Sequence, residues 1–126
     1  MAFAVRILAL LDKLPRTSGS EVVARQLAKS ATSIAANYRA TCNARSRDEF
    51  IAKLGVVVEE ADESECWLAI IVQRNLLPFA DAELERKEAA ELRAIFARSL
   101  GTARANRRLS RHTTRPAIYL KHVPDQ

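Results

Sequence analysis

The sequence predicts an all-α protein, an antiparallel up-down-up-down four-helix bundle followed by an irregular basic C-terminal tail. Three observations predict this fold. Hydrophobic residues make up 48% of the 126 residues, while the chain has only three glycines and four prolines, a composition typical of a compact, helix-rich protein. The apolar residues recur every three or four positions rather than every second position. Prolines and capping sequences divide the chain into four such segments.

The first two helices are separated by a proline. The first is expected from about Ala2 to Leu14, because Pro15 cannot continue a helix. The second is expected to begin at Ser18–Glu21 (SGSE), where a hydroxyl precedes Glu by three residues, the spacing of a capping box. It runs to about Asn43. Its apolar face consists of Val23, Leu27, Ala31, Ile34 and Tyr38.

The third helix is expected to begin at a second capping box, Ser46–Glu49 (SRDE), after a tight corner near Ala44 and Arg45. No proline interrupts it before Pro78, which allows a helix about 48 Å long. Its core-facing residues repeat every four and three positions alternately, as in a bundle with shallow crossing angles. These residues are Phe50, Leu54, Val57, Ala61, Ser64 and Leu68.

The fourth helix is expected to start near Asp81, with a first half rich in Glu, and to fade between Gly101 and Arg108. We therefore divide the chain into a four-helix bundle domain, residues 1–103, and a basic C-terminal tail, residues 104–126. Pro116 and Pro124 favour irregular structure in that tail. The apolar face of the fourth helix is expected to contain Leu92, Ile95, Phe96, Ser99 and Leu100.

Charge is distributed unevenly along the chain. The net charge is +5, and the tail, with six Lys/Arg and one Asp, carries that excess. Residues 1–53 hold nine basic and four acidic side chains, whereas residues 54–103 hold five and ten. A basic half and an acidic half can pair within the protein or with a partner, and the sequence leaves both interpretations open.

The basic residues suggest a surface for nucleic acid. Three cations fall within a narrow arc of the second helix, opposite its apolar face, and further cations follow at the corner and in the tail. Such a row can bind a phosphate backbone, so we predict low-specificity binding of RNA or DNA; a solvated face without a ligand is the alternative. The predicted nucleic-acid-binding residues are Arg25, Lys29, Arg39, Arg45, Arg47, Lys53, Arg104, Arg107, Arg108 and Arg111.

A second apolar flank of the third helix predicts an interface with another subunit. Val56, Trp67 and Ile70 lie away from the core-facing positions of that helix, and a helix that is apolar on more than one side is buried on more than one side. Together with Glu60 they form the predicted homo-oligomer interface. The alternative is that this flank contacts the first or fourth helix of the same subunit.

The sequence predicts neither catalysis nor a cofactor. The two cysteines, Cys42 and Cys66, match no disulfide framework and no zinc spacing. The carboxylates between residues 59 and 65 have no histidine near them, because His112 and His122 both lie in the tail. There is no glycine-rich phosphate loop. No segment approaches the roughly 20 apolar residues that span a membrane, so we expect a cytoplasmic protein without a metal.

Three stretches resemble a known family: SATSIAANYRA (30–40), ARSRDEFIAKL (44–54) and EADESECWL (60–68). They are similar to the four-helix bundle proteins encoded by intervening sequences in bacterial large-subunit ribosomal RNA genes, which are related to the accessory protein of diversity-generating retroelements. The first helix looks shorter than is usual in that family, and the basic tail is not part of the shared pattern.

The resemblance implies a ring-shaped homopentamer and no catalytic residues. For the retroelement relatives it also implies binding of nucleic acid and of a reverse transcriptase through a basic surface. A second hypothesis is a protein–protein assembly module, such as an accessory subunit for a reverse transcriptase, that does not itself bind nucleic acid.

Overall fold

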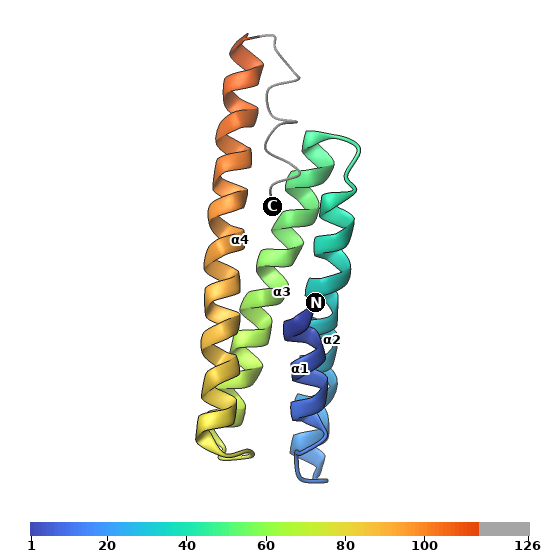
Figure 1. Ribbon diagram of the computed structural model, residues 1–126, viewed down its shortest axis with the longest axis vertical. Coiled ribbons are helices and arrows are strands. Elements are labelled where there is room, and N and C mark those ends of the chain that lie inside the picture. Colours follow the sequence, from blue (N-terminus) through green and yellow to red (C-terminus); the bar gives the residue numbers. More distant parts are fainter. Residues whose placement is uncertain (114–126) are drawn as a thin grey trace.

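The structure, a computed structural model, describes the backbone of residues 1–113 and the side chains of residues 1–110. It contains four α-helices that run alternately up and down (Figure 1), which confirms the predicted antiparallel bundle. Their bounds are Ala2–Leu11 for α1, Ser18–Cys42 for α2, Arg47–Gln73 for α3 and Phe79–Thr113 for α4.

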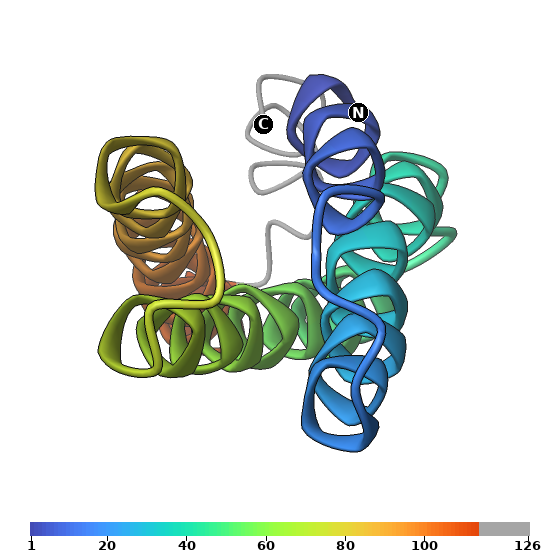
Figure 2. The ribbon, with the colours of Figure 1, turned by 90° about the horizontal axis from the view of Figure 1, so that it is seen from below.

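The helices pack in the order in which they occur along the chain. α3 packs extensively against both α2 and α4, whereas α1 packs mainly on α2 and touches α4 at few positions. Figure 2 shows this arrangement from below, with α1 and α4 facing each other across the open side of the bundle. The seams between α2, α3 and α4 therefore carry most of the packing.

The two predicted N-terminal caps differ in their outcome. At α3 the Oγ of Ser46 accepts a hydrogen bond of 3.1 Å from the backbone N–H of Glu49, as predicted. At α2 the helix begins at Ser18 as predicted, but the capping residue is Thr17 rather than Ser18, and the Oγ1 of Thr17 accepts the N–H of Ser20 at 3.3 Å. Thr17 also carries a hydroxyl, so it can satisfy the same kind of orphan amide one position earlier.

Two helices end earlier than predicted. α1 ends at Leu11 rather than Leu14. α3 ends at Gln73, five residues before Pro78, and its 27 residues span about 40 Å rather than 48 Å. Asn75 adopts a left-handed φ of 52°. The N–H of Leu76 donates to the carbonyl of Ile71 at 3.1 Å, and that of Asn75 to Val72 at 3.2 Å. This Schellman arrangement ends α3 without a glycine.

α4 is longer than predicted. It begins at Phe79 and continues through Gly101 to Thr113, so the expected fading between Gly101 and Arg108 is wrong. A glycine inside a helix costs only about 1 kcal/mol, and the Ala and Arg residues around Gly101 are strong helix formers. Residues 104–113 of the predicted tail are therefore helical. Residues 114–126 lie outside the described part of the chain.

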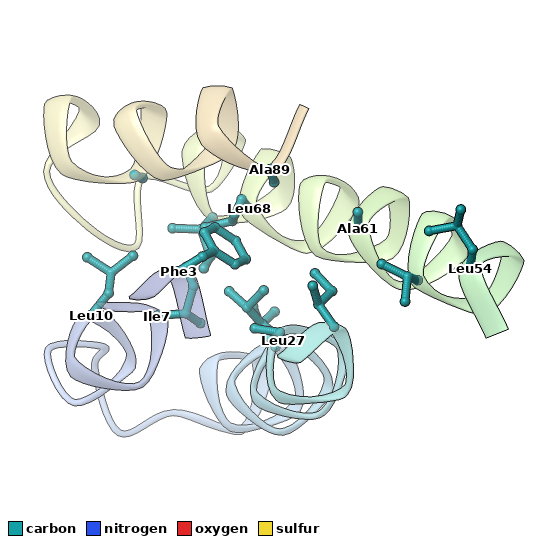
Figure 3. Packing of buried hydrophobic residues seen from close by; sticks show 14 of the residues in the cluster. Phe3, Ile7, Leu10, Leu27, Leu54, Ala61, Leu68 and Ala89 are labelled. Carbon is teal, nitrogen blue, oxygen red and sulfur yellow. The ribbon is translucent and has the colours of Figure 1, made fainter. Parts of the chain in front are cut away.

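The hydrophobic core confirms the faces predicted for α2 and α3. On α4 it confirms the predicted Leu92, Phe96 and Leu100 and contradicts Ile95. Ile95 is 48% exposed, and the fully buried positions of α4 are Ala82 and Ala89 instead. Both alanines belong to the core cluster. Side chains from all four helices meet in one cluster, part of which is drawn in Figure 3. The fully buried large residues of the cluster are Ile7, Leu27, Leu54, Val57, Leu68 and Ile71.

A small polar contact lies at the centre of the α2–α3 seam. The hydroxyl oxygens of Ser30 and Ser64 are 2.8 Å apart, and both residues are buried. The Ser30 hydroxyl donates to the carbonyl of Leu27 at 3.3 Å, so it accepts from Ser64. Each hydroxyl thus has a partner inside the apolar core, as buried polar groups require.

Candidate nucleic-acid interface

The basic row predicted on α2 lies in solvent. Arg25, Lys29 and Arg39 are all exposed and lie on one face of α2, opposite the buried Leu27. Residues 25 and 39 are about 21 Å apart along the helix axis. Within residues 1–110 none of the three side chains forms a hydrogen bond or an ion pair shorter than 4 Å. The row therefore presents three cations that no side chain of the described part neutralises at close range.

The cations predicted at the corner and on α4 fall into two groups. Arg47, in the first turn of α3, points across to α4, where its Nη1 lies 3.5 Å from the carbonyl oxygen of Asn106 and 3.4 Å from that of Arg107. The Nη1 of Arg107 in turn lies 3.4 Å from Oδ1 of Asp48. Each of these two arginines thus uses its Nη1 in a contact that joins the start of α3 to α4.

The remaining predicted cations stay at the surface near the same end of the bundle. Arg45 is exposed in the turn between α2 and α3, and Arg104 and Arg108 are exposed on α4. Lys53 is half-buried on α3. The contacts of Arg47 with α4 show that the corner and this part of α4 are neighbours, as Figure 1 also shows. Arg111 lies in the last turn of α4, and its side chain falls outside the described part.

The four residues predicted as an oligomer interface form one stripe along α3. Val56 is 38% exposed, and Glu60, Trp67 and Ile70 are half-buried. Trp67 and Ile70 pack partly against the core, and Nε1 of Trp67 donates to Oε1 of Glu63 at 3.3 Å. The chain thus covers part of this stripe itself and leaves the rest open to solvent. Its use as a subunit interface stays a prediction.

Within this stripe, the surroundings of Glu60 disfavour the ionised form of its carboxyl group. Burial raises the pKa of Glu60, and the neighbouring charges of Glu63 and Glu59 raise it further. Lys29, from the basic row on α2, acts in the opposite direction but does not offset them. The ionised form of Glu60 therefore destabilises the folded chain, and a partner that buries this stripe increases that cost.

We expect Glu60→Gln to stabilise the protein at pH 7. An acid whose folded pKa is raised imposes a cost above that pKa, and the cost disappears as pH falls through it. The substitution should raise the free energy of unfolding by less than about 1 kcal/mol, because the group is still partly solvated. Urea denaturation at pH 7 and pH 4 measures this. The difference between variant and parent should shrink toward pH 4; a constant difference would assign the effect to another cause.

Some acidic residues of α3 form ion pairs with arginines of α4. The sequence analysis did not predict these pairs. Arg93 lies 3.1 Å from Glu65 and 3.5 Å from Asp62, measured between nitrogen and oxygen. Arg86 lies 3.4 Å from Glu65. The two arginines are seven residues apart on α4, a spacing that places them on one face. These contacts favour internal pairing as the role of this acidic surface.

A further ion pair joins α1 to α4. Glu85 is only 7% exposed. The guanidinium of Arg6 donates to it from Nε at 2.9 Å and from Nη2 at 3.1 Å. The hydrogen bond with Glu85 raises the pKa of Arg6, with a smaller contribution from Glu88. Because both residues lie in helices with apolar neighbours, their sequence positions alone did not reveal the pair.

The described residues show no arrangement of metal ligands. No group of three or more His, Cys, Asp or Glu side chains among them could hold a metal ion. Cys42 and Cys66 are both free and exposed. In the same part of the chain, no helix is both long enough and apolar enough to cross a membrane.

Comparisons with known proteins agree with the fold. Residues 1–98 match a family model described as 23S rRNA-intervening sequence protein. The structure is similar to the crystal structure of a protein of unknown function from the S23 ribosomal protein family of Bacteroides thetaiotaomicron VPI-5482. The two share 31% sequence identity with a TM-score of 0.73, over 79% of this chain and 92% of the other. A search of curated proteins finds no match.

Proposed function

The chain belongs to the 23S rRNA-intervening sequence protein family, and on this premise we propose that it is a non-enzymatic, homo-oligomeric protein that binds RNA or DNA with low sequence specificity. The observation that carries the proposal is the row formed by Arg25, Lys29 and Arg39. It lies on the outer face of α2, in solvent and without close counterions in the described residues.

The chemistry of the row suits a phosphate backbone. Lysine and arginine bind phosphate oxygens through charge-assisted hydrogen bonds and release the counterions of the nucleic acid. Contacts to phosphates carry no direct information on base sequence. Arg45, at the end of α2, lies at the surface and extends the positive charge toward Arg104 and Arg108 on α4. A groove that selects bases is not needed for this mode of binding.

Assembly would multiply the effect of a short row. In a ring built through the stripe of Val56, Glu60, Trp67 and Ile70, each subunit contributes its own row, and several weak contacts act together. The homopentamer that the family resemblance implies is the assembly we propose. The row on α2 and the stripe on α3 are different residue sets, so the two functions can be tested separately.

The test is a triple substitution, Arg25→Ala/Lys29→Ala/Arg39→Ala. At about 0.1 M salt, losing three phosphate contacts should weaken binding of a fluorescent single-stranded RNA about 100-fold for each subunit that contacts the RNA, and the slope of log K against log salt should fall by about 2 for each such subunit. Fluorescence anisotropy at several salt concentrations measures both. The matched control, Arg74→Ala/Lys87→Ala/Arg98→Ala, removes the same charge from exposed positions elsewhere and should change affinity far less.

Light scattering on the same samples separates binding from assembly. The basic-row variant should keep the oligomeric mass of the parent, whereas Trp67→Glu should dissociate the assembly. If both triple variants lose the same RNA affinity, the basic row is not the binding surface, and the loss reflects only the lower net charge. A parent protein that oligomerises but ignores RNA and DNA would favour the assembly-module hypothesis, with a protein such as a reverse transcriptase as partner.

A further inference from the structure

A groove of about 500 Å³ lies beyond the N-terminal end of α1, between α2 and α4. It exists because α1 has 10 residues while α2 has 25, so that α1 lies beside only the lower part of α2 (Figure 1). Its lining is largely apolar and includes Phe3, Ile34, Leu92 and Phe96.

The two aromatic residues that line the groove on α2 and α4, Tyr38 and Phe96, are half-buried. The rings of Tyr38 and Phe96 are tilted against each other, with centroids 5.4 Å apart. Burial raises the pKa of Tyr38, and a hydrogen bond with Cys42 adds to this effect. Cys42 and Arg39 line the groove where α2 ends, and Glu88 lines it on α4. An apolar hollow with a polar margin is typical of a docking site.

We propose that the C-terminal segment of the same chain, residues 114–126, docks in this groove. The end of α4 is placed suitably for this. Arg47, at the start of α3, contacts the carbonyls of residues 106 and 107, so α4 ends beyond the α2–α3 corner, on the side where Cys42 lines the groove. The proposal does not depend on nucleic-acid binding.

The length of the segment is sufficient. Phe96 lies about 26 Å before Thr113 along α4, and Cys42 lies about one turn beyond Tyr38, on the side toward Thr113. An extended chain gains about 3.3–3.6 Å per residue. Position 120 can therefore lie about 23–25 Å from the end of α4, at the level of Cys42, and position 123 about 33–36 Å, at the level of Phe96.

The composition of the segment suits an apolar groove. Ile118, Tyr119, Leu120 and Val123 are apolar or aromatic. Pro116 cannot continue α4 as a regular helix, and it favours an extended residue before it. A short tether also gives the segment a high effective concentration at the groove, about millimolar. The family model ends at residue 98, so the docking is a feature of this chain beyond the shared pattern.

A disulfide trap in the full chain tests the proposal. The variant Leu120→Cys/Cys66→Ser keeps Cys42, which is exposed and lines the groove. Under oxidised glutathione, which accepts the two electrons, we expect an intramolecular disulfide between positions 42 and 120. Mass spectrometry and a non-reducing gel would show it as a monomer lighter by two hydrogens.

A matched control distinguishes a disulfide that forms because the segment docks from one that forms only because the two cysteines are in the same chain. Adding Ile118→Ser, Tyr119→Ser and Val123→Ser leaves the tether length unchanged but removes the apolar anchors, and should slow disulfide formation at least tenfold. Equal rates with and without the anchors would overturn the proposal, since the tether alone would then explain the bond. Disulfides between chains would also overturn it, because the groove would then hold a segment of a second copy.

Discussion

Leu68→Ala is expected to lower the free energy of unfolding by about 3–5 kcal/mol. Leu68 is fully buried on α3, within the cluster to which all four helices contribute (Figure 3). Truncation removes apolar contacts and leaves a cavity that long, packed helices cannot easily close. At about 4 °C per kcal/mol for a domain of this size, the melting temperature should fall by about 12–20 °C.

The measurement is thermal or urea denaturation followed by circular dichroism at one fixed protein concentration, because assembly makes apparent stability depend on concentration. Leu84→Ala is the matched control. It deletes the same atoms from α4 at a position that is 67% exposed and should change stability by less than about 0.5 kcal/mol. A loss at Leu84 comparable to that at Leu68 would mean that Leu84 is covered in solution and that the core assignment is incomplete.

Arg6→Met is expected to cost about 3 kcal/mol. The substitution removes the hydrogen bonds that Nε and Nη2 of Arg6 donate to Glu85, a residue that is only 7% exposed at the α1–α4 contact of the parent protein. Removing one partner of a buried pair leaves an uncompensated charge, which typically destabilises by about 3–5 kcal/mol. We take the lower end because the side chain of Arg6 is 44% exposed, so water can partly replace it.

The double variant Arg6→Met/Glu85→Leu provides the control. Replacing a buried ion pair by apolar residues of similar size is often close to neutral, so the double variant should recover most of the lost stability. The coupling energy of the double-mutant cycle then measures the pair directly. If the double variant is as unstable as Arg6→Met, Glu85 is not the source of the cost, and the loss comes from the packing of the Arg6 stem.

Local sequence signals were sufficient for most of α2 and α3. Their apolar faces follow from periodicity, and the cap at Ser46 follows from residue spacing. The face of α4 was harder to predict, because its two fully buried positions are alanines, which carry little hydrophobic signal, while the more apolar Ile95 is 48% exposed. The end of α3 was missed since Asn75 replaces the glycine that normally marks a left-handed helix end.

In the candidate site, too, the features that depend on one helix could be predicted, whereas those that depend on how the helices meet could not. The exposure of Arg25, Lys29 and Arg39 could be predicted, because a helix with a known apolar face has a known opposite face. The role of Arg47 could not, since its contacts with α4 depend on how the α2–α3 corner meets a helix 59 and 60 residues away in sequence. The groove beside α1 depends on relative helix lengths, which sequence boundaries locate only to within a few residues.

The sequential packing of the helices bears on how the protein folds. Because α1 packs on α2, α2 on α3 and α3 on α4, most contacts join segments that are neighbours along the chain, and such low contact order is typical of helical proteins that fold within microseconds to milliseconds. The Arg6–Glu85 contact, by contrast, closes a loop of 79 residues. We therefore expect it to form after the transition state, so that its loss accelerates unfolding while leaving the folding rate nearly unchanged.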